Sequence, residues 1–414
     1  MEQVVLNKIN VKQTQMGTLV QYDYDVPAAF QKYVRNDKSF DNMLFVEFPE
    51  DVTQIPPAVL AIPFVGIMLT VTMLLNVGIQ VPELDSRFFS SVVDIDRCFR
   101  KMYPKAQIKA IVTADRIVDC SYTPLDKKSL FFTGGVDATS ALVELVDASP
   151  LLVNIWGGDL WITDDSSHES LKLYLDQLAE SLNLKYYFIK TNARAMFNED
   201  KLGYLCDPLL GHKNNHGWWA SIAHILSMTT TIAPWAWKNR IATHYIGSSY
   251  DGQTKTFDSN NEELICAIRY CSCNFAMVDR LIGRNEKVKK IVRFRQENGT
   301  PISLKVCWQR TAGKNCCACE KCYRTIMNLI VNHANPNEYG FVVTSKTLYE
   351  MRKFLKVNTV STAFWKPIHQ AFLKERDFWK TVPEMSWFLC CRLNSPAVYA
   401  SKVKNKLANR IKKI

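Results

Sequence analysis

The sequence lacks an opening segment of the secretory type. Residues 1–25 mix polar and apolar side chains, with no basic start followed by an apolar stretch and small residues. It also lacks an apolar run with Lys and Arg clustered at its ends. Residues 56–79 are apolar and long enough to cross a membrane, but Pro63 and Gly66 interrupt them and no basic cluster flanks them. We therefore favour a buried helix over a membrane span and expect a cytoplasmic protein.

The cysteines lack the even number and regular spacing of a disulfide framework. The chain has 13 of them, irregularly placed, which favours reduced thiols and a metal site. Its 414 residues are 47% hydrophobic and 22% charged, a composition typical of a globular protein with two or three domains.

The net charge of +11 is concentrated at the C-terminus. The basic residues there are Lys402, Lys404, Lys406, Arg410, Lys412 and Lys413. Apolar residues fall on one helical face of the same segment, namely Val403, Leu407, Ile411 and Ile414. This pattern predicts a basic amphipathic helix. Peripheral contact with an anionic membrane, contact with RNA, and simple docking by the apolar stripe all remain open.

A short apolar strand that ends in two glycines is the first strong signal. After residues 130–132 come Thr133, Gly134, Gly135, Asp137 and Thr139. Apolar residues then recur at helical spacing as far as Pro150. A glycine pair between a strand and a helix exposes backbone N–H groups at the positive end of the helix, which suits phosphate. The two threonines would add hydroxyl donors and Asp137 would hold magnesium. An ordinary glycine-containing turn is the alternative.

Strands and helices alternate after residue 128. Apolar or β-rich runs at 151–156, 185–190 and 240–246 predict strands, and helices are predicted at about 163–182 and 217–231. Before this region, the run at 108–112 predicts a further strand. This alternation predicts a parallel sheet with helices on both faces, in which ligands lie at the carboxyl ends of strands. Gly158, Asp159, Gly247 and Ser248 occupy such ends and are candidates for the nucleotide or metal side. A capping role for Asp159 is the alternative.

Two further groups of side chains are weaker candidates. Arg280, Arg284 and Lys287 are predicted on one helix, where they would face a phosphate, a carboxylate or solvent. A long connection carries imidazole and indole groups that would contact a substrate or fill the core, namely His212, His216, Trp218, Trp219 and His224.

The cysteines Cys307, Cys316, Cys319 and Cys322 are the second strong signal. Three of them recur at intervals of three residues, and a compact turn would bring the four thiolates together as a closed tetrahedral zinc site of structural type. An iron–sulfur cluster is the alternative, although ferredoxin spacing is missing. Cys317 is out of spacing and is expected to be free.

The glycine-rich string resembles the PP-loop signature Ser-Gly-Gly-x-Asp-Ser-Thr of ATP pyrophosphatases, which cleave ATP to AMP and pyrophosphate. Thr133 replaces the first Ser and keeps a hydroxyl, whereas Ala138 replaces the second and removes one phosphate contact. The PP-loop and the cysteine spacing together resemble the 7-cyano-7-deazaguanine (queuosine precursor) synthases, which activate a carboxylate with ATP.

The chain resembles still more a PP-loop group encoded with surface-polysaccharide genes, whose relatives include an epimerase of a muramoyl-dipeptide glutamate. Shared features are the Gly-Asp after the second strand, the pair Arg284 and Lys287, and the string from Asn315 to Thr325. The resemblance covers about residues 129–327.

These observations predict an α/β fold in four parts. They are an N-terminal α+β region (1–122), a nucleotide-binding domain (123–300), a zinc–cysteine segment (301–335) and a C-terminal helical region (336–414). The resemblance implies a ligase-like enzyme that uses ATP and Mg²⁺ to adenylate a carboxylate or similar oxygen of a small or nucleotide-linked acid. In it Asp137, Arg284 and Lys287 would be catalytic. A tRNA-modifying enzyme and a non-enzymatic nucleotide sensor or scaffold are the alternatives.

Overall fold

The computed structural model describes residues 1–35, 43–211, 217–249, 259–307, 309, 312–396 and 398. Its strands are β1 (Gln3–Thr14), β2 (Gly17–Asp25), β3 (Leu44–Phe48), β4 (Gly78–Asp85), β5 (Val112–Val118), β6 (Leu125–Phe131), β7 (Leu151–Trp156), β8 (Tyr186–Thr191), β9 (Ile241–Gly247) and β10 (Asn274–Val278). They form one sheet in the order β10-β9-β6-β7-β8-β3-β2-β1-β4-β5.

The helices of the sheet region are α1 (Ala28–Gln31), α2 (Pro57–Leu75), α3 (Ser86–Met102), α4 (Val136–Leu145), α5 (Asp165–Leu182), α6 (Glu199–Leu210), α7 (His224–Thr231), α8 (Ala233–Lys238) and α9 (Glu262–Ala267). Beyond the sheet follow α10 (Arg284–Asn298), α11 (Glu320–Val331), α12 (Ser345–Val357), α13 (Thr362–Lys374), α14 (Arg376–Lys380) and α15 (Pro383–Ser386). Short 3-10 or π turns lie at Val146–Ala148, Trp219–Ala223, Pro336–Tyr339 and Trp387–Cys390.

The five strands β8-β7-β6-β9-β10 are all parallel to one another. Numbered along this half of the chain their order is 3-2-1-4-5, that of a doubly wound α/β sheet. Helices α4 and α5 pack on one face around Leu130, Leu142 and Leu175. On the other face Phe131, Val153 and Ile189 join the core that contains α2, α7 and α8. The predicted α/β sheet with helices on both faces is therefore present.

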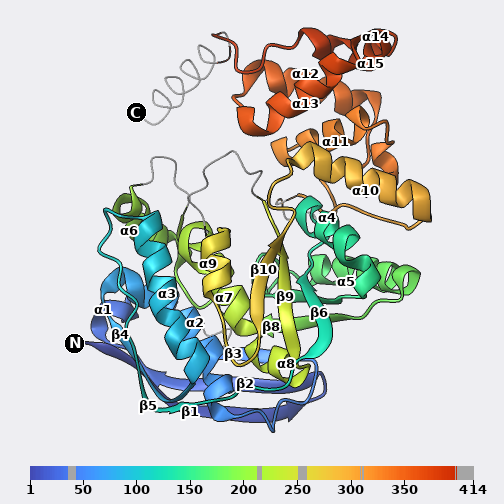
Figure 1. The fold of residues 1–414 in the computed structure, drawn as a ribbon. Helices are drawn as coiled ribbons and strands as arrows, with labels where there is room; N and C mark the ends of the chain where they lie inside the picture. Colours follow the sequence, from blue (N-terminus) through green and yellow to red (C-terminus); the bar gives the residue numbers. More distant parts are fainter. Residues whose placement is uncertain are drawn as a thin grey trace.

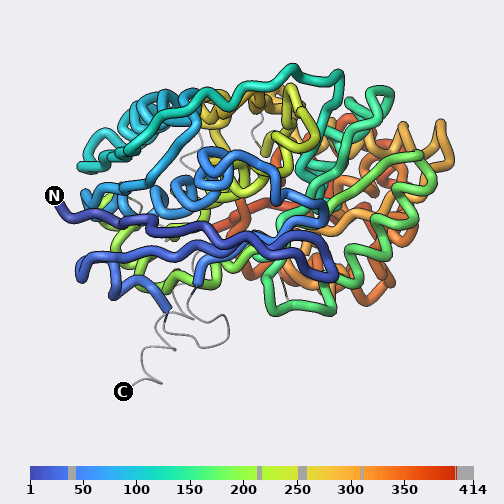
Figure 2. The backbone as a smooth tube through the Cα atoms, turned by 90° about the horizontal axis from the view of Figure 1, so that it is seen from below, coloured from blue at the N-terminus to red at the C-terminus, as the bar shows by residue number. Residues whose placement is uncertain are grey.

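The N-terminal strands extend this same sheet across the boundary predicted near residue 122. β3 pairs antiparallel with β8, and β1 and β2 form a long antiparallel pair on the underside of the molecule (Figure 2). β4 and β5 then complete the edge in parallel. Six of the nine strand pairings are parallel, so the sheet as a whole is mostly parallel.

Helix α2 is a core helix. It is the one helix of the described ranges that is long and apolar enough to cross a membrane, and 94% of its most apolar 18-residue window is buried inside the protein. An all-round apolar helix of this kind needs apolar neighbours on every side, which β4, α7 and α8 provide.

Two local predictions are wrong. The strand expected at 108–112 begins only at Val112 and runs to Val118, because it is an exposed edge strand whose polar residues hide its pattern. Arg280 precedes α10, which starts at Arg284, and forms an ion pair with Glu262. The helix predicted at 217–231 is confirmed, and it contains a π-helical turn at Trp219–Ala223 before α7.

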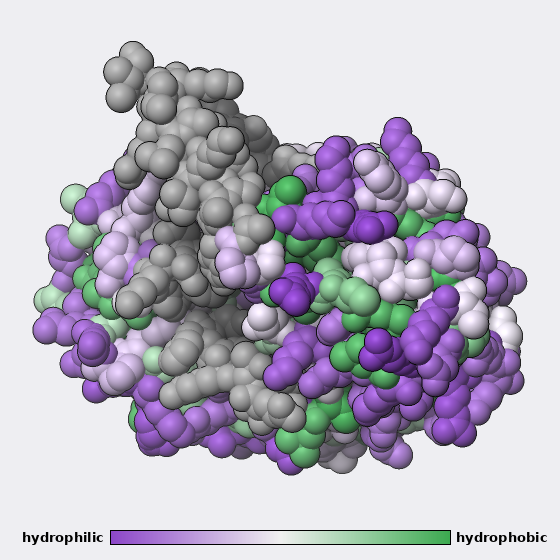
Figure 3. All heavy atoms as spheres, turned by 90° about the horizontal axis from the view of Figure 1, so that it is seen from above, coloured by the Kyte–Doolittle hydropathy of each residue, from purple (hydrophilic) through white to green (hydrophobic). Residues whose placement is uncertain are grey.

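Helices α10 to α15 lie above the carboxyl ends of β6, β9 and β10 (Figure 1). Two separate apolar cores hold them together, one between α10, α11 and residues 302–306, the other between α11 and α12–α15. From the same side, the described surface is mostly polar with small apolar patches (Figure 3). Helices α10 to α15 therefore cover the end of the sheet at which doubly wound folds bind their ligands. The predicted basic tail lies outside the described residues.

Candidate functional site

The turn after β6 has the backbone geometry expected of an anion site. Gly134 has φ +74°, a left-handed conformation that a residue with a Cβ adopts at a cost. Gly135 caps α4 without any side-chain hydrogen bond to its first turn, so no capping side chain competes with a ligand for those N–H groups. Thr139 is 1% exposed, and its Oγ1 has no hydrogen-bond partner in the described part of the chain.

The end of β9 lies directly against this turn. A Cβ on Gly247 would be 2.4 Å from the backbone oxygen of Asp137, so glycine is required for the two segments to approach. β6 and β9 are also the neighbours between which the strand order reverses, the place where doubly wound sheets bind ligands. The sequence pattern alone placed the two candidate loops on separate strands, and the sheet order brings them together.

Asp137 is held by two cations from α10. Its Oδ2 accepts from Arg284 Nη2 at 2.7 Å and its Oδ1 from Lys287 Nζ at 3.1 Å. Lys287 is 1% exposed and also donates to the backbone oxygen of Ser248. Burial raises the pKa of Asp137, but the charges of Arg284 and Lys287 outweigh burial and hold the pKa below its ordinary value. All four are predicted site residues, and the fold brings them into contact.

Two cations from α11 complete what we call the basic corner, made of Asp137, Arg284, Lys287, Lys321 and Arg324. Burial, and then the charges of Arg284 and Arg324, lower the pKa of Lys321. Burial and Arg284 lower the pKa of Arg324 to about 10. The guanidinium groups of Arg284 and Arg324 lie 5.5 and 4.0 Å from the ring centre of Phe364 on α13.

A second carboxylate, Asp159, follows the neighbouring strand β7. It accepts from Trp219 Nε1 at 3.0 Å and lies 3.2 Å from His224 Nε2 and 4.0 Å from Arg194 Nη1. Burial raises the pKa of Asp159, but His224, Trp219 and Arg194 together lower it by more. The net result is a pKa well below the ordinary value. The π-helical turn that starts at Trp219 places the indole toward this carboxylate.

Arg194 fixes the surroundings of Asp159. Its guanidinium lies 4.5 Å from the ring centres of both Trp161 and Trp219, and it pairs with Glu199 through two hydrogen bonds of 3.0 and 2.8 Å. It also donates to the backbone oxygen of Gly158 at 3.3 Å. We call this group the aromatic corner, made of Asp159, Trp161, Arg194, Trp219 and His224.

Two adjoining cavities lie between the corners. The larger, about 460 Å³, is bordered by the aromatic corner and by residues 305–307 and 313–315. The smaller, about 200 Å³, is bordered by Gly135, Asp137, Gly247 and Arg284. Both cavities are lined by Thr133, Asp159, Lys305, Val306 and Lys321. The side-chain oxygen of Asn154, in the wall of the larger cavity, is buried without a hydrogen-bond partner in the described structure.

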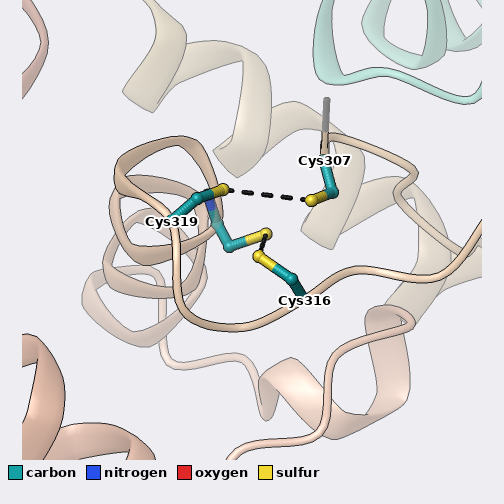
Figure 4. Close-up of side chains that lie close together, drawn as sticks. Cys307, Cys316 and Cys319 are labelled. Atoms are coloured by element: carbon teal, nitrogen blue, oxygen red, sulfur yellow. Dashed lines mark hydrogen bonds between the residues drawn. The ribbon is translucent and has the colours of Figure 1, made fainter. Parts of the chain in front are cut away.

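The four predicted cysteine ligands converge beside the larger cavity. Their Sγ atoms all lie within 4.8 Å of one another, with Cys307 to Cys319 at 3.9 Å and Cys316 to Cys322 at 3.8 Å. Tetrahedral zinc with Zn–S bonds of about 2.3 Å places sulfurs roughly 3.8 Å apart, so the donor set fits a metal ion of this kind. Figure 4 shows the sulfurs of Cys307, Cys316 and Cys319 pointing toward one another.

Cys319 belongs both to this cluster and to the start of α11. Its Sγ caps α11 by accepting from the backbone N of Cys322 at 3.5 Å. Hydrogen bonds, first of all from the Cys322 thiol, lower the pKa of Cys319 to about 5, which favours the thiolate that a metal requires. Cys317 has φ +51° and its Sγ contacts Asn315 O and Val342 N, so it is not part of the cluster.

The cysteine segment is tied to the glycine turn. Lys305 N donates to Gly134 O at 2.7 Å. Asn315 accepts from the backbone N of Val306 and of Cys307 and donates to Leu304 O. The cluster and the turn after β6 therefore belong to one hydrogen-bonded unit.

Sequence reasoning missed several residues of the site. Lys305, Lys321, Arg324, Arg194 and Trp161 all face or support the cavities. The position of Lys321 between two cysteine ligands was the one available signal. Of the weaker candidates, Trp218 is a core residue that donates to Thr70 O, whereas Trp219 and His224 join the site. His212 and His216 lie outside the described residues.

Comparison with protein-family models, with curated proteins and with solved structures finds no match for this chain.

Proposed function

We propose that the chain is an ATP-dependent adenylating enzyme of the PP-loop type, with magnesium as cofactor and zinc in the cysteine cluster. The observation that carries this proposal is the glycine turn at the β6–β9 switch point, facing Arg284 and Lys321 across a cavity. An uncapped helix start and a set of fixed cations are the groups that bind a polyphosphate.

The reaction begins with an oxygen of the acceptor acid attacking the α-phosphorus of ATP. The new P–O bond forms as the bond to the β-phosphate oxygen breaks, so that an acyl-adenylate and pyrophosphate result. The N–H groups after Gly135 and the Thr133 hydroxyl hold the phosphates, and Arg284 neutralises the charge that develops on the pyrophosphate. Magnesium, when bound with ATP, would supply further neutralisation.

Asp137 is assigned a second role besides magnesium binding. Both of its oxygens accept from Arg284 and Lys287, so it holds these cations in place before ATP arrives. Fixed cations need no reorganisation in the transition state. The four cysteines would hold zinc as a folding element, since four thiolates leave no open position for water.

The larger cavity is the proposed place of the acceptor. Lys305 and Lys321, which line it, suit a carboxylate, and Trp161 with Trp219 offers indole groups to the rest of the acceptor. The aromatic corner thus orients the acceptor while the basic corner holds the pyrophosphate part of ATP.

The test is release of AMP and pyrophosphate from ATP in the presence of fractionated cell extracts and candidate acids. We expect extract-dependent pyrophosphate that Asp137→Asn lowers at least about 100-fold, the scale on which a lost electrostatic contact acts. Asp147→Asn, an exposed carboxylate just after α4, is the matched control and should act as wild type. ATP binding without pyrophosphate from any acid would instead indicate a nucleotide sensor.

A further inference from the structure

The first turn of α11 is built into the cysteine cluster. Cys319 caps this helix and Cys322 lies in its first turn, so two of the four ligands flank Lys321. A metal bound to both cysteines would fix the backbone on either side of Lys321.

This turn is also a wall of the catalytic cavities. Lys321 borders both of them, is attracted by Asp159 and Asp137, and is repelled by Arg284 and Arg324. Lys321 is therefore held at the cavities despite repulsion from two neighbouring guanidinium groups.

Arg324 lies one turn further along the same helix. It is 6% exposed, its Nε has no hydrogen-bond partner in the described chain, and its guanidinium pairs with Glu320 at 3.4 Å. Glu320 in turn accepts from Nε1 of Trp365 at 2.8 Å, and this hydrogen bond ties the start of α11 to α13.

Cationic side chains of two helices gather in this region. They are Arg284 and Lys287 of α10 with Lys321 and Arg324 of α11, and the carboxylates of Asp137, Glu320 and Asp159 act on them. Fixed cations that lie beside the uncapped start of α4 are the groups that bind a phosphate anion through charge-assisted hydrogen bonds.

We propose that the metal cluster and the basic corner form one coupled unit: metal bound by the four cysteines places Lys321 against a polyphosphate, and the polyphosphate in return stabilises the bound metal. The link to Gly134 through Lys305 provides a second connection between cluster and phosphate turn. The inference rests on the proposed function only in taking the anion to be the pyrophosphate part of ATP. Coupling between two binding sites is reciprocal, so either ligand can report on it.

The experiment uses the zinc-loaded full chain and inorganic pyrophosphate as the probe. Calorimetric titration compares wild type with Lys321→Met, and with Lys289→Met as a control from the exposed side of α10. We expect Lys321→Met to weaken pyrophosphate binding about 10- to 100-fold, as for a lost charge-assisted hydrogen bond, with about twofold or less for Lys289→Met. Lys321→Arg, which keeps the charge, should recover most of the affinity.

The reciprocal measurement is the rate at which zinc passes to a chelating dye. The dye is present in excess and binds zinc more tightly than pyrophosphate does, and both proteins are measured under the same conditions, so that zinc bound by pyrophosphate itself contributes equally. We expect pyrophosphate, but not sulfate at equal ionic strength, to slow the transfer in wild type relative to Lys321→Met. This experiment starts from folded, metal-loaded protein, so it stays informative even if the metal-free chain unfolds.

Two results overturn the coupling. One is a pyrophosphate affinity that is the same in wild type and in a Lys321→Met protein that retains zinc, or a wild type that binds no pyrophosphate. The other is a zinc transfer rate that is indifferent to pyrophosphate. These outcomes can be told apart from failure of the proposed reaction. Lys321-dependent pyrophosphate binding without any ATP turnover would support the coupling and reject the ligase. ATP turnover that does not depend on Lys321 would support the ligase and reject the coupling.

Discussion

The basic corner and the aromatic corner each hold a carboxylate beside the cavities, but with different partners. Each centres on a carboxylate that follows one of two neighbouring parallel strands, and each carboxylate has a pKa below its ordinary value. Asp137 is held by cations from α10, a helix beyond the sheet. Asp159 is held by Trp219, His224 and Arg194, which belong to the sheet region itself.

In the proposed function the two corners would have different roles. The basic corner has more positive than negative charge and is supported by α11, which the cysteine cluster caps. In the aromatic corner one cation, Arg194, pairs with the two carboxylates Asp159 and Glu199 and lies against two indole rings. A polyphosphate suits the first and the organic part of an acceptor the second. The two corners should therefore respond differently when a metal ligand is removed, when a charge is removed and when a methyl group is added.

The largest expected effect is that of Cys319→Ser. This change removes a metal ligand and the cap of α11, and we expect loss of the metal together with destabilisation on the order of 4 kcal/mol. The basic corner should lose its geometry, whereas the aromatic corner, which belongs to the sheet region, should keep it. Elemental analysis and urea unfolding measure both quantities. Cys317→Ser, which lies outside the cluster, should keep the metal; if it loses the metal, the ligand set is wrong.

Asp137→Asn tests how far the basic corner depends on its one central carboxylate. The change leaves Lys287, whose side chain is 2% exposed, without its ionic partner. Breaking a buried ion pair of this kind should cost about 3 kcal/mol of unfolding free energy, measured by urea unfolding at pH 7. A cost as small as that of the exposed control Asp147→Asn would contradict the role given to Asp137.

Gly247→Ala tests the close approach of β9 to the turn after β6. The new Cβ would meet Asp137 O at 2.4 Å, so the two segments must separate. We expect about 2 kcal/mol of destabilisation and weaker pyrophosphate binding, with the aromatic corner unaffected. Gly203→Ala inside α6 is the control, since alanine favours a helix interior and the change should be neutral or stabilising.

Asp159→Asn should have the smallest effect, about 1 kcal/mol, because the side chain is half exposed and asparagine can still accept from Trp219. The folded-state pKa of Asp159 is depressed, so its contribution is present above the unfolded pKa and is lost as the pH falls through the folded value. The difference in unfolding free energy between wild type and variant should therefore shrink below about pH 4. A difference that grows on acidification would refute the assignment.

Much of the fold could be predicted where the sequence pattern is strong. The predicted strand at 151–156 coincides with β7, and the predicted helix with leucines at 171, 175, 178 and 182 is α5. The edge strand β5 could not be placed, because its exposed residues carry no alternation. Continuity of the sheet between β8 and β3 was equally hidden, since pairing between distant strands leaves no local signal.

The same division applies to the site. The glycine turn with Asp137 at a helix start, and the convergence of four cysteines, could be predicted from sequence because both are local patterns with a direct backbone consequence. The pairing of Arg284 and Lys287 with Asp137 could not. The same holds for the place of Arg194 between two tryptophans and of Lys321 in the cavity wall. These contacts join residues far apart in the chain, and packing of α10 and α11 over the strand ends, rather than sequence spacing, sets their geometry.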